Sequence, residues 1–82
     1  MADYRVVNST NQTIFWRDGA WNSPEVRAGQ ALDQESNHDA DVTMYGKDGG
    51  GDHEWGRVWI HIGTTLEVYG DKNWRSRVTT FR

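Results

Sequence analysis

The segment from Val58 to Ile62 sets the strongest limit on what this chain can fold into. Val58, Ile60 and Ile62 alternate with Trp59 and His61. A period of two residues places the apolar side chains on one face of a β-strand and the aromatic and polar side chains on the other. No stretch keeps a helical period over three turns, so the sequence predicts a chain built from strands.

Short β-rich runs separated by turn signals continue this pattern along the chain. Residues 4–7 and 13–16 are the first two runs, with a polar turn between them. Asp18-Gly19 and the glycine-rich segment 46–52 mark further turns. We therefore expect an all-β fold, a small antiparallel β-sandwich or barrel of about six or seven strands. Residues 30–40 are mostly polar and are expected to form a surface loop.

Aromatic side chains must supply much of the core of this domain. A chain of 82 residues, expected to form a single all-β domain over residues 1–82, buries only about 60–65% of the surface that its unfolded form exposes. The chain has no cysteine, which excludes disulfides and cysteine-based zinc sites. Its five Trp, three Tyr and two Phe can compensate, since each ring buries about 150–250 Å².

Charged residues are unevenly distributed, although the formal net charge is only −3. Residues 33–54 are rich in Asp and Glu, whereas the segment after Asp71 is basic. Nucleic-acid binding is disfavoured, because phosphate contacts need a broad basic face. The N-terminus lacks a basic start followed by an apolar stretch, and no run approaches the length of a membrane span. We expect a soluble protein, cytoplasmic or released without a visible signal peptide.

Catalytic patterns are missing from the sequence. It has no cysteine nucleophile and no Gly-x-Ser-x-Gly elbow. The carboxylates are numerous, but none is marked by an apolar pocket that would separate two pKa values. His38, His53 and His61 lie in three different segments, which does not indicate a zinc site. We therefore expect a protein that is not an enzyme.

One short phrase occurs twice, as FWRDGAWNS at residues 15–23 and as VYGDKNWRS at residues 68–76. The copies share an aromatic residue, an acid, a tryptophan and a serine at matching positions: Trp16 and Tyr69, Asp18 and Asp71, Trp21 and Trp74, Ser23 and Ser76. An aromatic residue at a strand end, a polar turn with Asp and a second aromatic residue describe a folded hairpin. The sequence predicts two similar folded hairpins, on duplicated halves that face each other across one core.

The same segments resemble the βγ-crystallin superfamily, in a partial match at residues 13–30 and 52–76. In that family a strand ending in an aromatic pair is followed by a folded hairpin with a second aromatic residue. A glycine, usually with positive φ, follows two residues later. Both copies depart from the pattern, because Ser23 and Ser76 stand where the family has this glycine.

The crystallin resemblance also implies a calcium site ahead of the second hairpin. Asp52 matches an acidic position of that site, whereas Gly56 and Arg57 replace its hydroxyl residues. Calcium takes about six to eight oxygen ligands, so this version of the site is weakened. We expect either no cofactor or weak calcium binding at Asp48 and Asp52.

A weaker resemblance connects the chain with the bulb-type mannose lectins. Their repeats also run from a strand through a tyrosine and a polar turn to a tryptophan, and residues 37–49 with Trp55 would form a third such repeat. The sugar-binding pattern of these lectins is matched loosely by Asn37, Asp39, Asp41, Thr43 and Tyr45.

The tryptophans favour carbohydrate binding. A thin core does not comfortably enclose all five, so at least one is expected to be exposed. A pyranose has an apolar face that stacks on an aromatic ring and hydroxyls that need donors and acceptors. We expect a lectin-like binding module with glycans as partners. Its candidate site residues are Asp18, Trp21, Asp71, Asn73, Trp74 and Arg75.

Other interpretations remain open at this point. The tryptophans could instead pack in the core or in the interface of a homodimer or higher homo-oligomer. The crystallin resemblance would make the chain a structural, stress-associated, toxin or inhibitor module. An inhibitor or immunity partner of another protein would use exposed Trp59 as an anchor.

Overall fold

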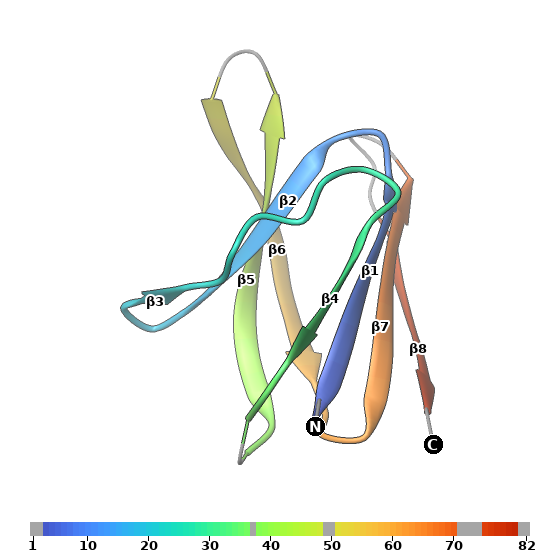
Figure 1. Ribbon diagram of the computed structural model, residues 1–82. Helices are drawn as coiled ribbons and strands as arrows, with labels where there is room; N and C mark the ends of the chain where they lie inside the picture. The colour runs from blue at the N-terminus through green and yellow to red at the C-terminus, as the bar shows by residue number, and fades with distance from the viewer. Residues whose placement is uncertain (1–2, 37, 49–50, 71–74, 81–82) are drawn as a thin grey trace.

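The computed structural model describes residues 3–36, 38–48, 51–70 and 75–80, with only the backbone for Asp48, Gly70 and residues 75–80. These parts of the chain form two four-stranded sheets that pack as a β-sandwich (Figure 1). The radius of gyration is 11.7 Å, close to the value of about 12 Å expected for a compact chain of this length.

The first sheet has the strand order β4-β1-β7-β8. Its strands are β1 (Tyr4–Thr10), β4 (Ala31–Gln34), β7 (Thr64–Gly70) and β8 (Arg75–Thr80). β1 pairs antiparallel with β4 and parallel with β7, and β7 pairs antiparallel with β8. The first strand of the chain is therefore a central strand of its sheet.

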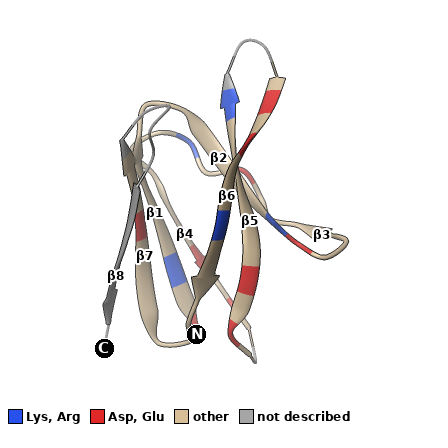
Figure 2. Cartoon of the chain, turned by 180° about the vertical axis from the view of Figure 1, so that it is seen from behind, with Lys and Arg blue, Asp and Glu red and all other residues tan. Residues whose placement is uncertain are grey.

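The second sheet has the strand order β3-β2-β5-β6, with all pairs antiparallel. Its strands are β2 (Thr13–Asp18), β3 (Trp21–Asn22), β5 (Ala40–Asp48) and β6 (Gly51–Ile60). The ends of β5 and β6 project beyond the rest of the sandwich (Figure 1). Seen from behind, a basic position of β6 lies beside an acidic position of β5, and Arg57 of β6 forms an ion pair with Asp41 of β5 (Figure 2).

The core lies between the inner faces of the two sheets. Alternate residues of β1 point inward, and the strands of both sheets contribute fully buried side chains. The largest apolar ones are Trp16, Ile14, Met44, Ile60, Leu66, Val6, Val42 and Val68. Because the apolar side chains that point inward from each sheet need a second surface to cover them, two facing sheets bury them together.

The all-β sandwich expected from the sequence is confirmed. The described residues contain eight strands, of which β3 has only two residues. The segment 30–40 differs from the expected loop, since it contains β4. Ile62 also differs, because β6 ends at Ile60 and leaves Ile62 exposed in the following turn. Among the described residues there is no helix with the length and apolar character needed to cross a bilayer.

Candidate functional site

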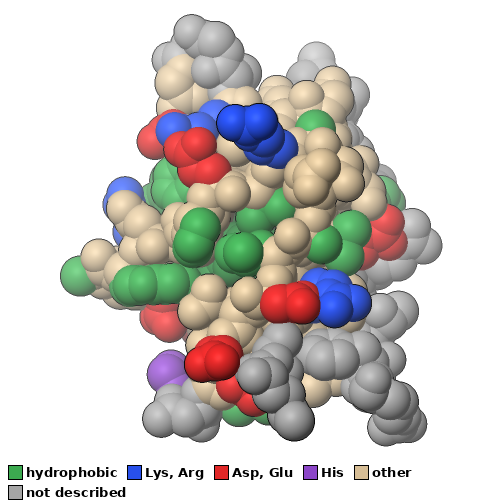
Figure 3. Space-filling model, viewed as in Figure 1, with side chains coloured by type: hydrophobic (Ala, Val, Ile, Leu, Met, Phe, Trp, Pro, Cys, Tyr) green, Lys and Arg blue, Asp and Glu red, His purple; other side chains and the backbone are tan. Residues whose placement is uncertain are grey.

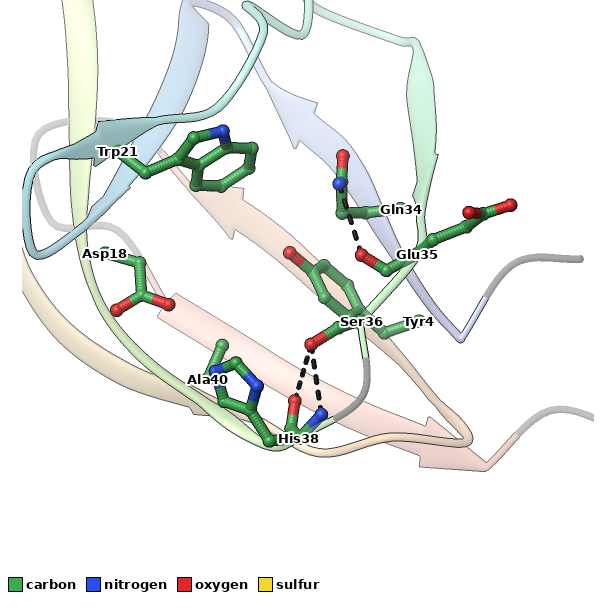
Figure 4. A pocket seen from close by; sticks show the side chains of 8 residues that line it. All are labelled: Tyr4, Asp18, Trp21, Gln34, Glu35, Ser36, His38 and Ala40. Carbon is green, nitrogen blue, oxygen red and sulfur yellow. Dashed lines mark hydrogen bonds between the residues drawn. The ribbon is translucent and has the colours of Figure 1, made fainter.

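A hollow of about 290 Å³ lies at the edge of the sandwich, between β3 and the connection from β4 to β5 (Figure 4). Two residues expected from the sequence, Asp18 and Trp21, line one side of it. The rest of its lining comes from β1, β4, the connection and the start of β5: Tyr4, Gln34, Glu35, Ser36, His38 and Ala40. We refer to this cavity as the Trp21 hollow.

The β2–β3 hairpin carries Trp21 out to the rim of the hollow. Asp18 pairs with Trp21 across a two-residue turn. In this turn Gly19 has a φ of 59°, whereas Ala20, like every other non-glycine residue that the structure describes, does not have a positive φ. A positive φ at the first turn residue alone is typical of a type II′ hairpin. Because β3 is a two-residue strand at the edge of its sheet, the Trp21 side chain stays partly open to solvent and is 44% exposed.

Ser23 holds the chain in place directly after this hairpin. Its hydroxyl accepts a hydrogen bond from the Trp16 amide at 2.9 Å and donates one to the Pro24 carbonyl at 2.9 Å. Its amide donates to the Trp16 carbonyl at 2.8 Å. Ser23 does not have the positive φ typical of the crystallin glycine. The serine instead fastens the outgoing chain to β2, which fixes the position of Trp21.

Tyr4 forms the floor of the hollow. The side chain is only 2% exposed, and its hydroxyl accepts a hydrogen bond from the Trp16 indole nitrogen at 3.3 Å. Burial raises the pKa of Tyr4 above its ordinary value of 10.0; the Trp16 hydrogen bond opposes this effect, and the negative charge of Asp18 adds to it. The hydroxyl therefore stays protonated at neutral pH, and its oxygen points toward the hollow (Figure 4).

Asp18 presents a carboxylate without a protein partner. The residue is partly buried, and within the described part of the chain its carboxylate makes no hydrogen bond or salt bridge. Figure 4 shows the carboxylate on the same side of the hollow as Trp21. Carboxylates removed from water without a partner cost free energy, so this arrangement favours a ligand that brings hydrogen-bond donors.

The opposite wall of the hollow is polar. The Gln34 amide donates to the Glu35 carbonyl at 3.3 Å, and the Ser36 hydroxyl donates to the His38 carbonyl at 2.7 Å. The Asp3 carboxylate accepts a hydrogen bond from the Ser36 amide at 2.8 Å and so fastens this connection to the start of β1. The Glu35 carboxylate points away from the hollow (Figure 4). The wall therefore offers an amide and an imidazole to a ligand.

Hydrophobic side chains are exposed in the middle of the same face of the molecule, between β3 and β4, and acidic side chains lie below them in this view (Figure 3). This face combines an exposed aromatic ring, hydrogen-bonding groups of both kinds and negative charge. Such a mixture suits a ligand with an apolar face and many hydroxyls.

The second copy of the repeated phrase also forms a hairpin, β7–β8. Gly70 pairs with Thr10 at the far end of β1, whereas Tyr4 at the near end lines the Trp21 hollow. β1 is seven residues long, and at about 3.3 Å per residue this length separates the two hairpins by roughly 20 Å. The two hairpins therefore lie in different sheets.

The predicted residues of the second hairpin are not placed by the structure. Asp71, Asn73 and Trp74 lie outside the described residues, and Arg75 begins β8 with its side chain not described. The sequence did not indicate Tyr4, Gln34, Ser36 or His38 as site residues. They face Trp21 only because the two sheets pack against each other, and no local motif marks them.

The residues expected to bind calcium do not form a site in the described part of the chain. Asp52 lies 3.8 Å from the Lys47 amine in an exposed position, and the side chain of Asp48 is not described. Among the described residues no group of three or more His, Asp or Glu side chains is placed to hold a metal ion.

The residues of the mannose-lectin pattern mainly contact other protein side chains. Asp39 lies 3.0 Å from the His61 ring, and Asp41 pairs with Arg57. Tyr45 stacks on Phe15 with ring centroids 5.0 Å apart. Asn37 lies outside the described residues.

Searches of protein-family models, of curated proteins and of solved structures returned no match to this chain.

Proposed function

We propose that this protein binds carbohydrate in the Trp21 hollow and is not an enzyme. The observation that carries the proposal is the exposed Trp21 indole beside the partly buried, unpartnered carboxylate of Asp18, on one side of a hollow of about 290 Å³. An aromatic platform next to an acceptor for hydroxyl groups is the chemistry that a pyranose needs.

Each wall of the hollow has a role in this proposal. The apolar face of a sugar ring stacks on Trp21, and the Asp18 carboxylate accepts hydrogen bonds from neighbouring hydroxyls. The Tyr4 hydroxyl and the Gln34 amide donate to ring or hydroxyl oxygens. The volume is at the lower end of the range of about 300–1,000 Å³ usual for small-molecule sites, so the hollow holds a sugar unit while the rest of a glycan extends into solvent.

The β7–β8 hairpin is proposed as a second site. In the sequence, Asp71, Asn73, Trp74 and Arg75 repeat the kinds of side chain found in the first hairpin. Two sites in one chain, or more in a homodimer or higher homo-oligomer, would raise the avidity for a multivalent glycan through effective concentration.

The test compares two exposed tryptophans, of which only one lies in the hollow. Trp21 is 44% exposed and Trp59, on the outer face of β6, is 54% exposed. The wild-type protein is screened on a glycan array and then titrated with its best ligand. Trp21→Ala is expected to weaken binding by about tenfold or more, the equivalent of about 1.4 kcal/mol, whereas Trp59→Ala should bind like the wild type.

Trp21→Ala/Trp74→Ala removes both proposed platforms and is expected to abolish binding. The two single variants and the double variant are first checked for a native circular dichroism spectrum and an unchanged melting temperature. Glycan binding that survives in the folded double variant would contradict the proposal, as would a wild-type protein that binds no glycan on the array.

A further inference from the structure

The Trp21 hollow carries an uncompensated negative charge. The Asp18 carboxylate is partly buried and has no hydrogen-bond or salt-bridge partner in the described part of the chain. Among the described side chains that line the hollow, none belongs to Lys or Arg. Of the lining residues that the structure describes, only His38 has a basic side chain, and it is exposed.

The arginines nearest in sequence or in register are engaged elsewhere. Arg17 precedes Asp18 in β2, so its side chain leaves the opposite face of the sheet. There it donates to the Asn22 side chain at 2.8 Å and lies 5.2 Å from the centre of the Tyr45 ring. Arg5 forms a two-bond contact with Asp33 on the outer face of β1 and β4. Neither side chain neutralises Asp18.

We propose that the sugar bound in the Trp21 hollow is an amino sugar whose free amine is protonated, and that this ammonium group pairs with the Asp18 carboxylate. The inference rests on the proposed carbohydrate-binding function and names the class of sugar. A charge-assisted hydrogen bond is shorter and stronger than the bond a neutral hydroxyl would make to the same carboxylate. An ammonium group near Trp21 also gains from the negative face of the indole ring.

The same electrostatics disfavours the other common classes of sugar. Acetylation of the amine removes its charge and adds volume, so an N-acetylated sugar leaves Asp18 without a counter-charge. A sulfated or uronic sugar brings a second negative charge next to Asp18, and the described lining contains no Lys or Arg to compensate it.

Three oligosaccharides with the same length and linkage test the proposal: oligomers of glucosamine, of N-acetylglucosamine and of glucose. They differ only in the ammonium, acetamide or hydroxyl group at one ring position. Binding is measured by titration calorimetry at low ionic strength and at a pH below the pKa of the amine. The glucosamine oligomer is expected to bind about tenfold or more tightly than the other two.

A matched pair of variants assigns this preference to Asp18. Asp18→Asn keeps the size of the side chain and removes its charge, and it should bring the three affinities to within about threefold of one another. Glu54→Gln removes an exposed acid of β6 that does not line the hollow, and it should leave the preference intact. Because Asp18 has no protein partner, its variant is expected to keep the wild-type melting temperature.

The same affinities measured at higher salt concentration test the ion pair without any mutation. Salt screens the pair between the ammonium group and Asp18, so the preference for the glucosamine oligomer should decrease. His38→Gln should not reduce the preference, because His38 is not the group that binds the amine.

The outcomes separate this inference from the proposed function. Equal binding of all three oligomers, still lost in Trp21→Ala, would overturn the ammonium pairing and leave carbohydrate binding in place. Ethanolamine binding as tightly as the glucosamine oligomer would also overturn it, because the amine alone would then be the ligand. No binding of any sugar would remove the proposed function itself.

Discussion

Asn8 is a polar residue that is buried within this small protein. It is fully buried, and its amide nitrogen donates to the carbonyls of Gln12 at 2.7 Å and Val26 at 2.8 Å. Its side-chain oxygen accepts hydrogen bonds from the Thr10 amide at 2.9 Å and hydroxyl at 2.6 Å. The side chain thus ties the β1–β2 turn to the segment that leads into β4, which forms one wall of the hollow.

Replacing Asn8 should destabilise the fold. Asn8→Ala leaves the carbonyls of Gln12 and Val26 without their buried donor, and a buried unsatisfied polar group costs about 1–3 kcal/mol. Urea unfolding measures the loss as a lower transition midpoint. The control is Asn11→Ala, at an exposed residue of the same type in the adjacent turn, where a change within about 0.5 kcal/mol is expected. Equal effects of the two substitutions would refute this role of Asn8.

The hairpin of β5 and β6 depends on a bulge that makes room for a tryptophan. Met44 pairs with Gly56 and Tyr45 pairs with Glu54, which leaves Trp55 as the extra residue. Trp55 packs against the core cluster and over Gly46. A Cβ atom on Gly46 would lie 2.1 Å from the Cζ2 atom of the Trp55 ring. Gly46 is therefore needed for space and not for a special backbone conformation.

Gly46→Ala should accordingly destabilise the protein by about 1–3 kcal/mol, because overpacking forces the ring or the strand to move. Chemical denaturation with Trp fluorescence gives the free energy of unfolding. In a Trp55→Leu background the smaller side chain leaves room for the methyl group, so the additional cost of Gly46→Ala should largely disappear. A cost that is the same in both backgrounds would show that the indole is not the obstacle.

Titratable groups on both sheets set the pH range over which the whole sandwich is stable. The Arg5 guanidinium beside Asp33 lowers the pKa of that carboxyl below its ordinary value of 3.8. Hydrogen bonds from His61 and from the Ile62 amide lower the pKa of Asp39 in the same way. Burial raises the pKa of Tyr4 above 10.0.

Stability should therefore decrease at both ends of the pH scale. A carboxyl with a lowered folded-state pKa stabilises the fold above about pH 3.8, and this stabilisation is lost as the pH falls through the folded-state pKa. The raised pKa of Tyr4 has the opposite effect on the pH dependence. Protonated Tyr4 stabilises the fold below about pH 10, and this stabilisation is lost as the pH rises further. Both acid pairs are exposed and screened by solvent, so the acid effect should be small.

Melting temperatures across the pH range check this expectation. The double variant Asp33→Asn/Asp39→Asn should have a slightly lower melting temperature near neutral pH and a smaller decrease in melting temperature at acid pH. The decrease in melting temperature at alkaline pH should remain. An acid decrease as steep as that of the wild type would show that other carboxyls are responsible.

Local features of the sequence were sufficient for the class of fold and for part of the site. Two-residue alternation predicted strands, Asp18-Gly19 predicted the tight turn, and the surplus of tryptophans predicted that at least one would be exposed, as Trp21 and Trp59 are. These features involve neighbours in the chain, whose geometry follows from backbone conformation and side-chain size.

The sequence therefore determined the strands, the hairpin and the exposure of a tryptophan, whereas the tertiary structure decided what faces Trp21. β4 carries few apolar side chains of its own, and it exists as a strand because β1 pairs with it from Tyr4 to Val7. The parallel pairing of β1 with β7 joins residues about 60 positions apart, beyond the reach of any local period. The polar wall opposite Trp21 is thus a product of two sheets packing on one core, because the burial that drives this packing depends on total apolar area and not on any short motif.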